Sequence, residues 1–245
     1  MRRARGARRP RPLPRRHVRA PPPAREVLFP LYAFNLEVAR APWMTREPLL
    51  AEMRLQWWRD VVAGARSQPL PAHEVAGPLA ALIAAGRLDP APLDALIEAR
   101  RRDIEARPFA LSELRPYLEG TAGNLLWAAA AALGATDRTA VLEAGFAQGA
   151  ASWLLALPAL SASGRGLAQP GPEPVRALAS EALAALARAR AARPGAAAAL
   201  RAATLAGPVL RAALRDPAAA TEGRLALSEG SRRLRLLWAT WRGTW

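Results

Sequence analysis

The residues that could carry chemistry are few, because the chain has no cysteine and only two histidines, His17 and His73. Disulfides, thiolate metal sites, cysteine nucleophiles and histidine-rich metal centres are therefore excluded. The remaining candidates are six polar side chains in the segments that we expect to fold. They are Tyr32, Asn35, Asp103, Tyr117, Asn124 and Gln148. They fit two roles, either as the lining of a ligand cavity or as helix caps and buried hydrogen-bond pairs.

Arginine accounts for all 35 basic residues, which with 20 acidic residues give a net charge of +15. Residues 1–25 hold ten arginines and no acidic residue, which leaves +5 for residues 26–245. The sequence shows no basic stripe with interleaved aromatic residues, so nucleic acid is not a predicted partner. Abundant Arg, Ala, Pro and Gly without Lys is typical of a GC-rich genome, so we attribute much of the positive charge to mutational bias.

The elements that position these candidates are predicted to be helices. Leu28, Leu31, Tyr32 and Leu36 follow helical spacing, with Pro30 in the first turn and a stop near Pro42. The next helix covers residues 48–64, with Leu49, Met53, Trp57 and Val61 on one apolar stripe. Further helices are predicted over residues 75–85, 91–106, 112–134, 138–160, 173–192, 196–215 and 224–241.

The predicted fold class is all-α, because no segment alternates β-branched and polar residues as a strand would. We expect one bundle-like domain over residues 25–245, after a disordered Arg/Pro-rich segment over residues 1–24. A shifted reading frame or a misassigned start would produce such a segment. No run of 18 uninterrupted apolar residues occurs, so no transmembrane helix is predicted.

Four segments combine aromatic, arginine, glycine and carboxylate residues in a fixed order. The first reads Leu28-Phe-Pro-Leu-Tyr-Ala-Phe-Asn-Leu-Glu-Val-Ala-Arg40, and the second reads Arg54-Leu-Gln-Trp-Trp-Arg-Asp60. In the third, Asp103 is followed by Leu114, Tyr117 and Ala122-Gly123. The fourth reads Gly145-Phe-Ala-Gln-Gly-Ala-Ala-Ser-Trp-Leu-Leu-Ala156 and continues to Gly164-Arg165.

In order and spacing these segments resemble the squalene/phytoene synthase family over roughly residues 25–170. Tyr32-Ala-Phe34 matches the family's Leu-Tyr-Ala-Phe-Cys-Arg helix, and Trp58 and Arg59 match its Arg-Leu-x-x-Trp-Arg segment. The asparagine at Asn35 and the run Leu-Gln-Trp-Trp-Arg-Asp resemble a divergent branch of the family. That branch contains the mitochondrial complex I assembly factor and its proteobacterial relatives.

The chain departs from active family members at the aspartates with which they perform their chemistry. The aspartate and glutamate positions fall here on Ala39, Arg40, Trp43, Ala156, Ala159 and Leu160. The family reaction ionises an allylic diphosphate with the help of Mg²⁺, which binds through oxygen ligands. None of the six residues supplies one. The resemblance therefore implies no cofactor, and Mg²⁺ is required only if the chain is an enzyme.

The resemblance leaves two functions open. The leading interpretation is a non-catalytic, synthase-like protein that assists the assembly of respiratory complex I, with complex I subunits or assembly intermediates as partners. The alternative is a prenyltransferase of the squalene/phytoene synthase type, which condenses two prenyl diphosphates head to head. In either case we expect a location in the bacterial cytoplasm, with peripheral contact at the inner membrane.

The resemblance also implies a remnant of the family cavity that could hold a lipid or prenyl ligand, without catalytic residues or metal ligands. Its candidate lining residues are Tyr32, Phe34, Asn35, Arg40, Trp58, Arg59, Asp103, Tyr117, Asn124, Gln148 and Arg165. We expect Arg59 to pair with a buried carboxylate such as Asp103. At the C-terminus, Trp238, Trp241 and Trp245 alternate with Arg235 and Arg242, which fits either a membrane-surface helix or a packed terminal helix.

Overall fold

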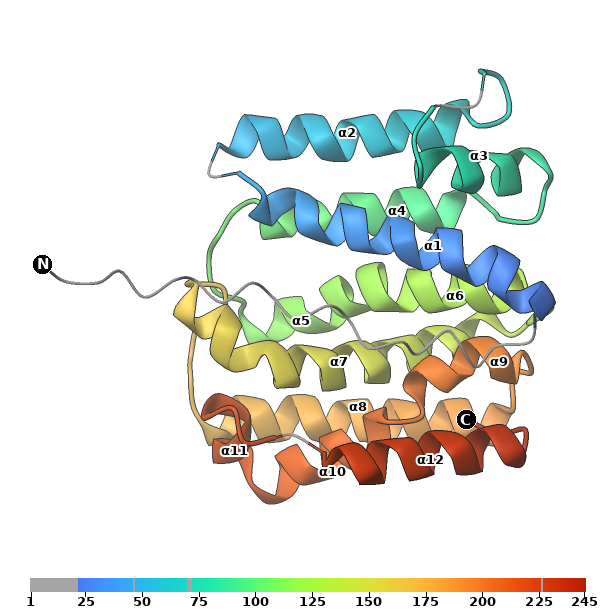
Figure 1. Cartoon of the computed structure of the whole chain (residues 1–245). Coiled ribbons are helices and arrows are strands. Elements are labelled where there is room, and N and C mark those ends of the chain that lie inside the picture. The colour runs from blue at the N-terminus through green and yellow to red at the C-terminus, as the bar shows by residue number, and fades with distance from the viewer. Residues whose placement is uncertain (1–21, 46, 70–71, 226) are drawn as a thin grey trace, which may run out of the picture.

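Helices make up most of the computed structural model, which describes residues 22–45, 47–69, 72–225 and 227–245 (Figure 1). The α-helices are α1 (Pro22–Arg40), α2 (Pro48–Gly64), α3 (Ala76–Ala84), α4 (Ala91–Arg100), α5 (Leu111–Leu118), α6 (Asn124–Ala131), α7 (Arg138–Ala162), α8 (Pro172–Ala192), α9 (Ala197–Leu200), α10 (Ala206–Arg215), α11 (Pro217–Thr221) and α12 (Glu229–Trp241). Short 3₁₀ segments are η2 (Ala41–Trp43), η3 (Arg101–Asp103) and η5 (Arg201–Ala203), and η4 (Glu119–Gly123) is a π-helix. Within the described ranges there is no strand, only one isolated bridge between Phe109 and Leu167. The predicted all-α fold is confirmed.

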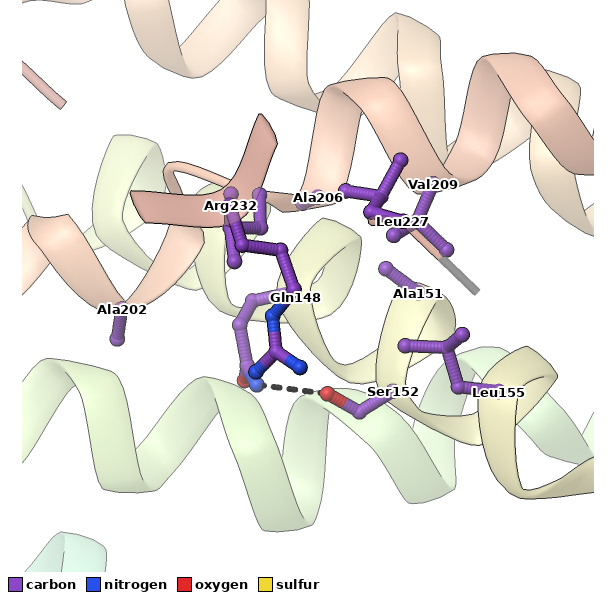
Figure 2. Close-up of a pocket in the computed structure, with 10 residues that line it drawn as sticks. Gln148, Ala151, Ser152, Leu155, Ala202, Ala206, Val209, Leu227 and Arg232 are labelled. Atoms are coloured by element: carbon purple, nitrogen blue, oxygen red, sulfur yellow. Dashed lines mark hydrogen bonds between the residues drawn. The ribbon is translucent and has the colours of Figure 1, made fainter. Parts of the chain in front are cut away.

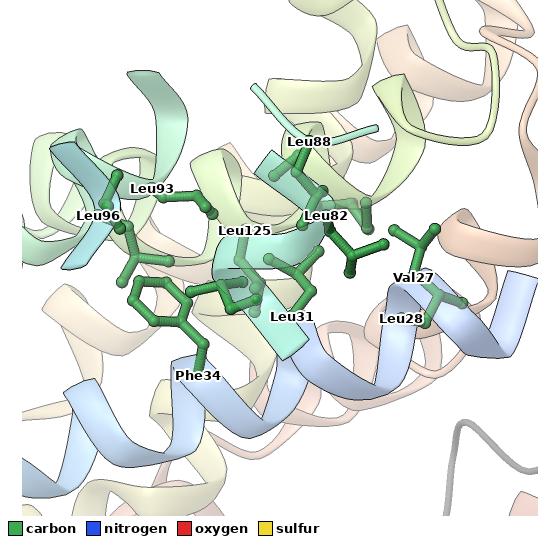
Figure 3. Close-up of a cluster of buried hydrophobic side chains, with 14 of the residues drawn as sticks. Val27, Leu28, Leu31, Phe34, Leu82, Leu88, Leu93, Leu96 and Leu125 are labelled. Atoms are coloured by element: carbon green, nitrogen blue, oxygen red, sulfur yellow. The ribbon is translucent and has the colours of Figure 1, made fainter. Parts of the chain in front are cut away.

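Helix α1 begins at Pro22, three residues before the predicted start of the folded region. The rest of the segment expected to be disordered, residues 1–21, lies outside the described residues. Pro30 is the ninth residue of the helix, so its predicted place in the first turn was wrong. Helix α1 buries a continuous apolar face against α3, α4 and α6, as Figure 3 shows. That face includes Val27, Leu28, Leu31 and Phe34.

Helix α2 matches the predicted range at both ends, but the predicted apolar stripe faces outward. Leu49 is 71% exposed, Met53 59% and Trp57 41%. The buried face instead carries Ala51, Leu55, Trp58 and Val62. Both sets have helical spacing, and the second packs against α4 and η2.

Helix α7 lies at the centre of the bundle and packs against α6, α8, α10 and the π-helix η4 (Figure 1). Two hydrophobic clusters meet along it. The first joins α7 to the N-terminal helices through Val141 and Ala144, and the second joins it to α8 and α10 through Phe146 and Leu154. The fourth sequence segment therefore lies on the helix that connects both halves of the core.

Among the described residues, two segments are long and apolar enough to cross a membrane by length and composition, although neither is an uninterrupted apolar run. They are Arg138–Ala162 and Ala197–Arg215, and 67% and 56% of their most apolar windows are buried inside the protein. Burial to this extent is typical of core helices, which need apolar residues on most sides.

Candidate functional site

One face of α7, within the fourth segment, lines a cavity of about 230 Å³ (Figure 2). Its other walls come from η5, α10, Leu227 and the start of α12. The lining residues are Gln148, Ala151, Ser152, Leu155, Ala202, Leu205, Ala206, Val209, Leu227 and Arg232. Ser152 and Leu155 occupy two of the family's polar positions, so this hollow adjoins the degenerate motif.

The cavity has one small polar corner in an otherwise aliphatic wall. The amide Nε2 of Gln148 donates a hydrogen bond to Ser152 Oγ at 3.0 Å, one helical turn along α7. Arg232 extends from α12 toward this pair in Figure 2. Its side chain is 30% exposed, and its Nη1 lies 3.6 Å from a Glu229 carboxylate oxygen. A single cation above an apolar wall suits a small amphiphile with an anionic end.

Mg²⁺ does not fit the residues at the motif positions. Ala39 is half-buried, and Arg40 is exposed and lies 3.8 Å from Glu37 on the same helix. On α7, Ala156 and Ala159 are exposed and offer no oxygen ligand. Across the described part of the chain, no three His, Asp or Glu side chains are grouped to hold a metal ion.

Trp43 and Arg165 meet at the ends of the first and fourth segments. Trp43 stands where the family has the last aspartate of the first motif, and Arg165 keeps the family's arginine position. The Arg165 guanidinium lies 4.1 Å from the centroid of the Trp43 indole ring. Its Nε also donates to the backbone carbonyl of Asp103 at 3.3 Å. A cation–π contact therefore replaces the carboxylate at this place.

Asp103 and Tyr117 form a buried polar cluster with Arg100. Asp103 is 6% exposed, and the Tyr117 hydroxyl donates to its carboxylate at 2.9 Å. Arg100 Nη1 donates to the same carboxylate at 3.2 Å and to the Tyr117 oxygen at 2.7 Å. Burial raises the pKa of Tyr117 above its usual range, and the neighbouring Asp103 adds to the rise although Arg100 opposes it. The cluster ties α4 to α5 and satisfies the Asp103 carboxylate and the Tyr117 hydroxyl, whereas Nε of Arg100 is buried without a hydrogen-bond partner.

Arg59 pairs with α4 rather than with Asp103, so the predicted pairing was wrong. Its Nε lies 2.7 Å from Asp94 Oδ1 and its Nη1 lies 3.1 Å from Glu98 Oε2. Asp94 and Glu98 are one turn apart on the face of α4 next to α2. These two carboxylates bind the Arg59 guanidinium, whereas the Asp103 carboxylate is bound by Arg100 and Tyr117.

The remaining predicted lining residues lie mostly in the core. Phe34 is fully buried and meets Trp58 edge to face, with 5.4 Å between ring centroids. Tyr32 and Asn35 are half-buried on α1. Asn124 is buried and donates to the Gly120 carbonyl at 3.0 Å, within the π-helical turn.

Close contact between α7 and the π-helix η4 fixes the position of the fourth segment. A Cβ on Gly145 would lie 2.6 Å from the Gly123 Cα, and one on Gly149 would lie 2.8 Å from the Ala122 Cβ. Gly149 stands where active family members have glutamine. Here that position is closed by the neighbouring helix.

Of the predicted lining residues, only Gln148 reaches the cavity. Asp103 and Tyr117 come together in the polar cluster, Arg165 donates to the backbone carbonyl of Asp103, and Phe34 meets Trp58 in the core. Arg232 was not predicted from the sequence as a lining residue. The signal that could have found it is its position in a C-terminal helix rich in arginine. A second hollow of about 780 Å³ beside α5 and α8 contains Arg115 and Glu181, which form an ion pair, and none of the predicted residues lines it.

The helical bundle and these motif positions define a synthase-like protein without the metal-binding carboxylates. A model of the squalene/phytoene synthase family matches residues 17–157, which is more than half of the chain. The chain belongs to this family.

Curated relatives are similar over slightly more than half of the chain. The Bos taurus protein named "NADH dehydrogenase (ubiquinone) complex I, assembly factor 6" is 30% identical over 142 residues, 56% of this chain and 43% of that protein. The Homo sapiens protein of the same name is 29% identical over 142 residues, with the same coverage. The matched segment spans less than half the length of each relative.

A solved structure titled "Crystal structure of a dehydrosqualene synthase in complex with ligand" shares the fold. Its TM-score is 0.72, and the match covers 92% of this chain and 88% of that chain at 14% sequence identity. The isoprenoid synthase type of fold predicted from the sequence is thereby confirmed.

Proposed function

We propose that this chain is a non-catalytic, synthase-like protein that assists the assembly of respiratory complex I and needs no metal cofactor. The observation that carries the proposal is the loss of every oxygen ligand at Ala39, Arg40, Trp43, Ala156, Ala159 and Leu160. The similarity to the named assembly factors supports the assembly role. Its partners would be complex I subunits or assembly intermediates, met on the cytoplasmic side of a bacterial inner membrane.

The cavity beside the degenerate motif is small for the substrates of the transferase. Pockets that enclose drug-sized ligands usually measure about 300–1,000 Å³. The cavity here is about 230 Å³, too small for two prenyl diphosphates held together. Its single guanidinium, Arg232, would also replace only part of the charge that a metal cluster places around a diphosphate leaving group.

A prenyltransferase is the second candidate function, because the chain belongs to a family of such synthases and shares the fold of one. The direct test is to incubate purified protein with farnesyl or geranylgeranyl diphosphate and Mg²⁺, beside an active dehydrosqualene synthase. We expect no squalene-like or phytoene-like product above background. One preorganised electrostatic contact commonly stabilises a transition state by about 2.7–4 kcal/mol. The two missing sets of metal ligands would remove several such contacts. Mg²⁺-dependent product from the unmodified chain would replace the proposed function with the transferase.

Gene deletion tests the assembly role itself. We expect loss of complex I activity with unchanged isoprenoids, and recovery when the intact gene is returned. Loss of isoprenoids with normal complex I would support the transferase instead.

Complementation also tests whether the cavity takes part in the assembly role. Ser152→Phe fills it, whereas Ser180→Phe places the same side chain on an exposed part of α8. If the cavity is needed, only Ser152→Phe fails to restore complex I activity.

A further inference from the structure

Positive charge in the folded part of the chain is concentrated in its last third. Residues 172–245 hold twelve arginines against five acidic residues, a net charge of +7. Residues 22–171 hold fourteen arginines against fifteen acidic residues, a net charge of −1. Eight of these twelve arginines lie on α8, α10 and α12, which form the layer at the bottom of Figure 1.

Helix α12 carries an exposed apolar face within this layer. Leu234 is 69% exposed, Leu237 53%, Trp238 55% and Trp241 77%. Successive helical residues are about 100° apart, so these four fall within an arc of about 100°. The opposite side holds Ala239, which is buried against the bundle.

Arginines border the exposed face of α12 on both sides. By the same helical geometry, Arg233 follows one edge, and Arg235 and Arg242 follow the other. The Arg242 guanidinium lies 4.3 Å from the centroid of the Trp238 ring, and Trp238 and Trp241 contact each other with centroids 5.4 Å apart. Glu229 is the only acidic residue of this helix.

On α12 itself, Arg233 pairs with Glu229 at 2.9 Å, and the end of the helix adjoins a further arginine from α8. Arg190 of α8 lies 5.7 Å from the centroid of the Trp245 ring. Burial lowers the pKa of Arg190, and repulsion from Arg211 adds to the effect. A nearby anion would relieve this repulsion.

We propose that α12 lies in the headgroup region of an anionic phospholipid bilayer, with Leu234, Leu237, Trp238 and Trp241 toward the acyl chains. Tryptophan favours the membrane–water interface, and the flanking arginines match anionic phosphates in sign. The helix has 13 residues and is about 20 Å long, less than the roughly 30 Å of a hydrocarbon core, so it lies along the surface.

The exposed apolar row on α2 provides the contrast. Leu49, Met53 and Trp57 lie beside both signs of charge, Arg54 and Asp60, so this row lacks the complementarity of α12. It also supplies matched controls. Leu49 is 71% exposed and Leu234 is 69% exposed, so Leu49→Ser and Leu234→Ser remove the same side chain at equal exposure.

The test is co-sedimentation of the full chain with phosphatidylglycerol–phosphatidylcholine vesicles and with phosphatidylcholine vesicles. We expect strong preference for the anionic vesicles. The double variant Arg233→Gln/Arg242→Gln should lower the partition coefficient about 30-fold, equivalent to about 1 kcal/mol per arginine. Arg66→Gln, beside α2, should change it little. Leu234→Ser should weaken binding, and Leu49→Ser should not.

Brominated lipids separate α12 from the arginines of residues 1–25, which contain no tryptophan. We expect lipid bromine to quench tryptophan fluorescence, and Trp238→Phe/Trp241→Phe to remove most of this quenching while Trp57→Phe leaves it. Equal binding to both vesicle types, unchanged binding of the double arginine variant, or quenching that depends on Trp57 would each overturn the proposal. The assay contains no complex I and no prenyl diphosphate, so its outcome is independent of the proposed function.

Discussion

Gly145→Ala tests the contact between α7 and the π-helix η4, on which the position of the fourth segment depends. The new Cβ would lie 2.6 Å from the Gly123 Cα and 3.0 Å from the Ala122 carbonyl oxygen, whereas ordinary contacts are 3.4–4 Å. The two backbones would have to separate by roughly 0.8 Å, and neither can move as a flexible side chain could. Overpacking of this kind costs about 1–3 kcal/mol, partly offset by up to about 1 kcal/mol from the higher helix propensity of alanine.

We therefore expect Gly145→Ala to lower the free energy of unfolding by about 1–2 kcal/mol, or the melting temperature by about 2–8 °C for a chain of this size. Urea unfolding followed by circular dichroism measures it. Gly230→Ala in α12 is the matched control, since its Cβ would meet nothing within 4 Å and the variant should be neutral or stabilising. A Gly145→Ala protein as stable as the Gly230→Ala control would refute the close helix contact.

Two further variants test the polar contacts around α5. Tyr117→Phe leaves the buried Asp103 carboxylate with one fewer donor, and we expect a loss of about 1–3 kcal/mol in urea unfolding, which an unchanged midpoint would contradict. For Glu113, the Arg107 guanidinium and the backbone N–H of Ala110 lower the pKa from 4.5 to about 2. Its stabilising effect is therefore present above pH 4.5 and is lost as the pH falls toward 2. The stability difference between wild type and Glu113→Gln should shrink over that window, and a constant difference would disprove this linkage.

The course of the helices could be predicted from the sequence because their ends carry local signals. Pro48 and Gly64 bound α2 at the predicted residues, and Gly134 and Asp137 separate α6 from α7. The buried face of α2 could not be predicted with equal success. Leu49, Met53 and Trp57 repeat at the same spacing as the residues that are buried, and only the neighbouring helices decide between the two faces.

Candidate site residues were harder to place, because their partners are distant in sequence. Arg59 pairs with Asp94, which is 35 residues away in the sequence. Arg165 contacts Trp43, which is 122 residues away. Periodicity reports which side of a helix is buried, but not which polar residue faces another across an interface. The motif order indicated the family correctly, whereas the pairing of Arg59 required three-dimensional structure.

The degenerate motif positions have structural contacts of their own, and these contacts bear on whether simple substitutions could rebuild a metal site. The Arg165 guanidinium packs on the ring of Trp43. The Ala122 side chain lies so close to Gly149 that a Cβ at position 149 would clash with it. Replacing Trp43 with aspartate would remove the ring that Arg165 contacts. Replacing Gly149 with the family's glutamine would force α7 away from η4. The loss of the metal ligands is therefore linked to helix packing, and aspartates introduced at Ala39 and Arg40 alone would leave Ala156, Ala159 and Leu160 without an oxygen ligand.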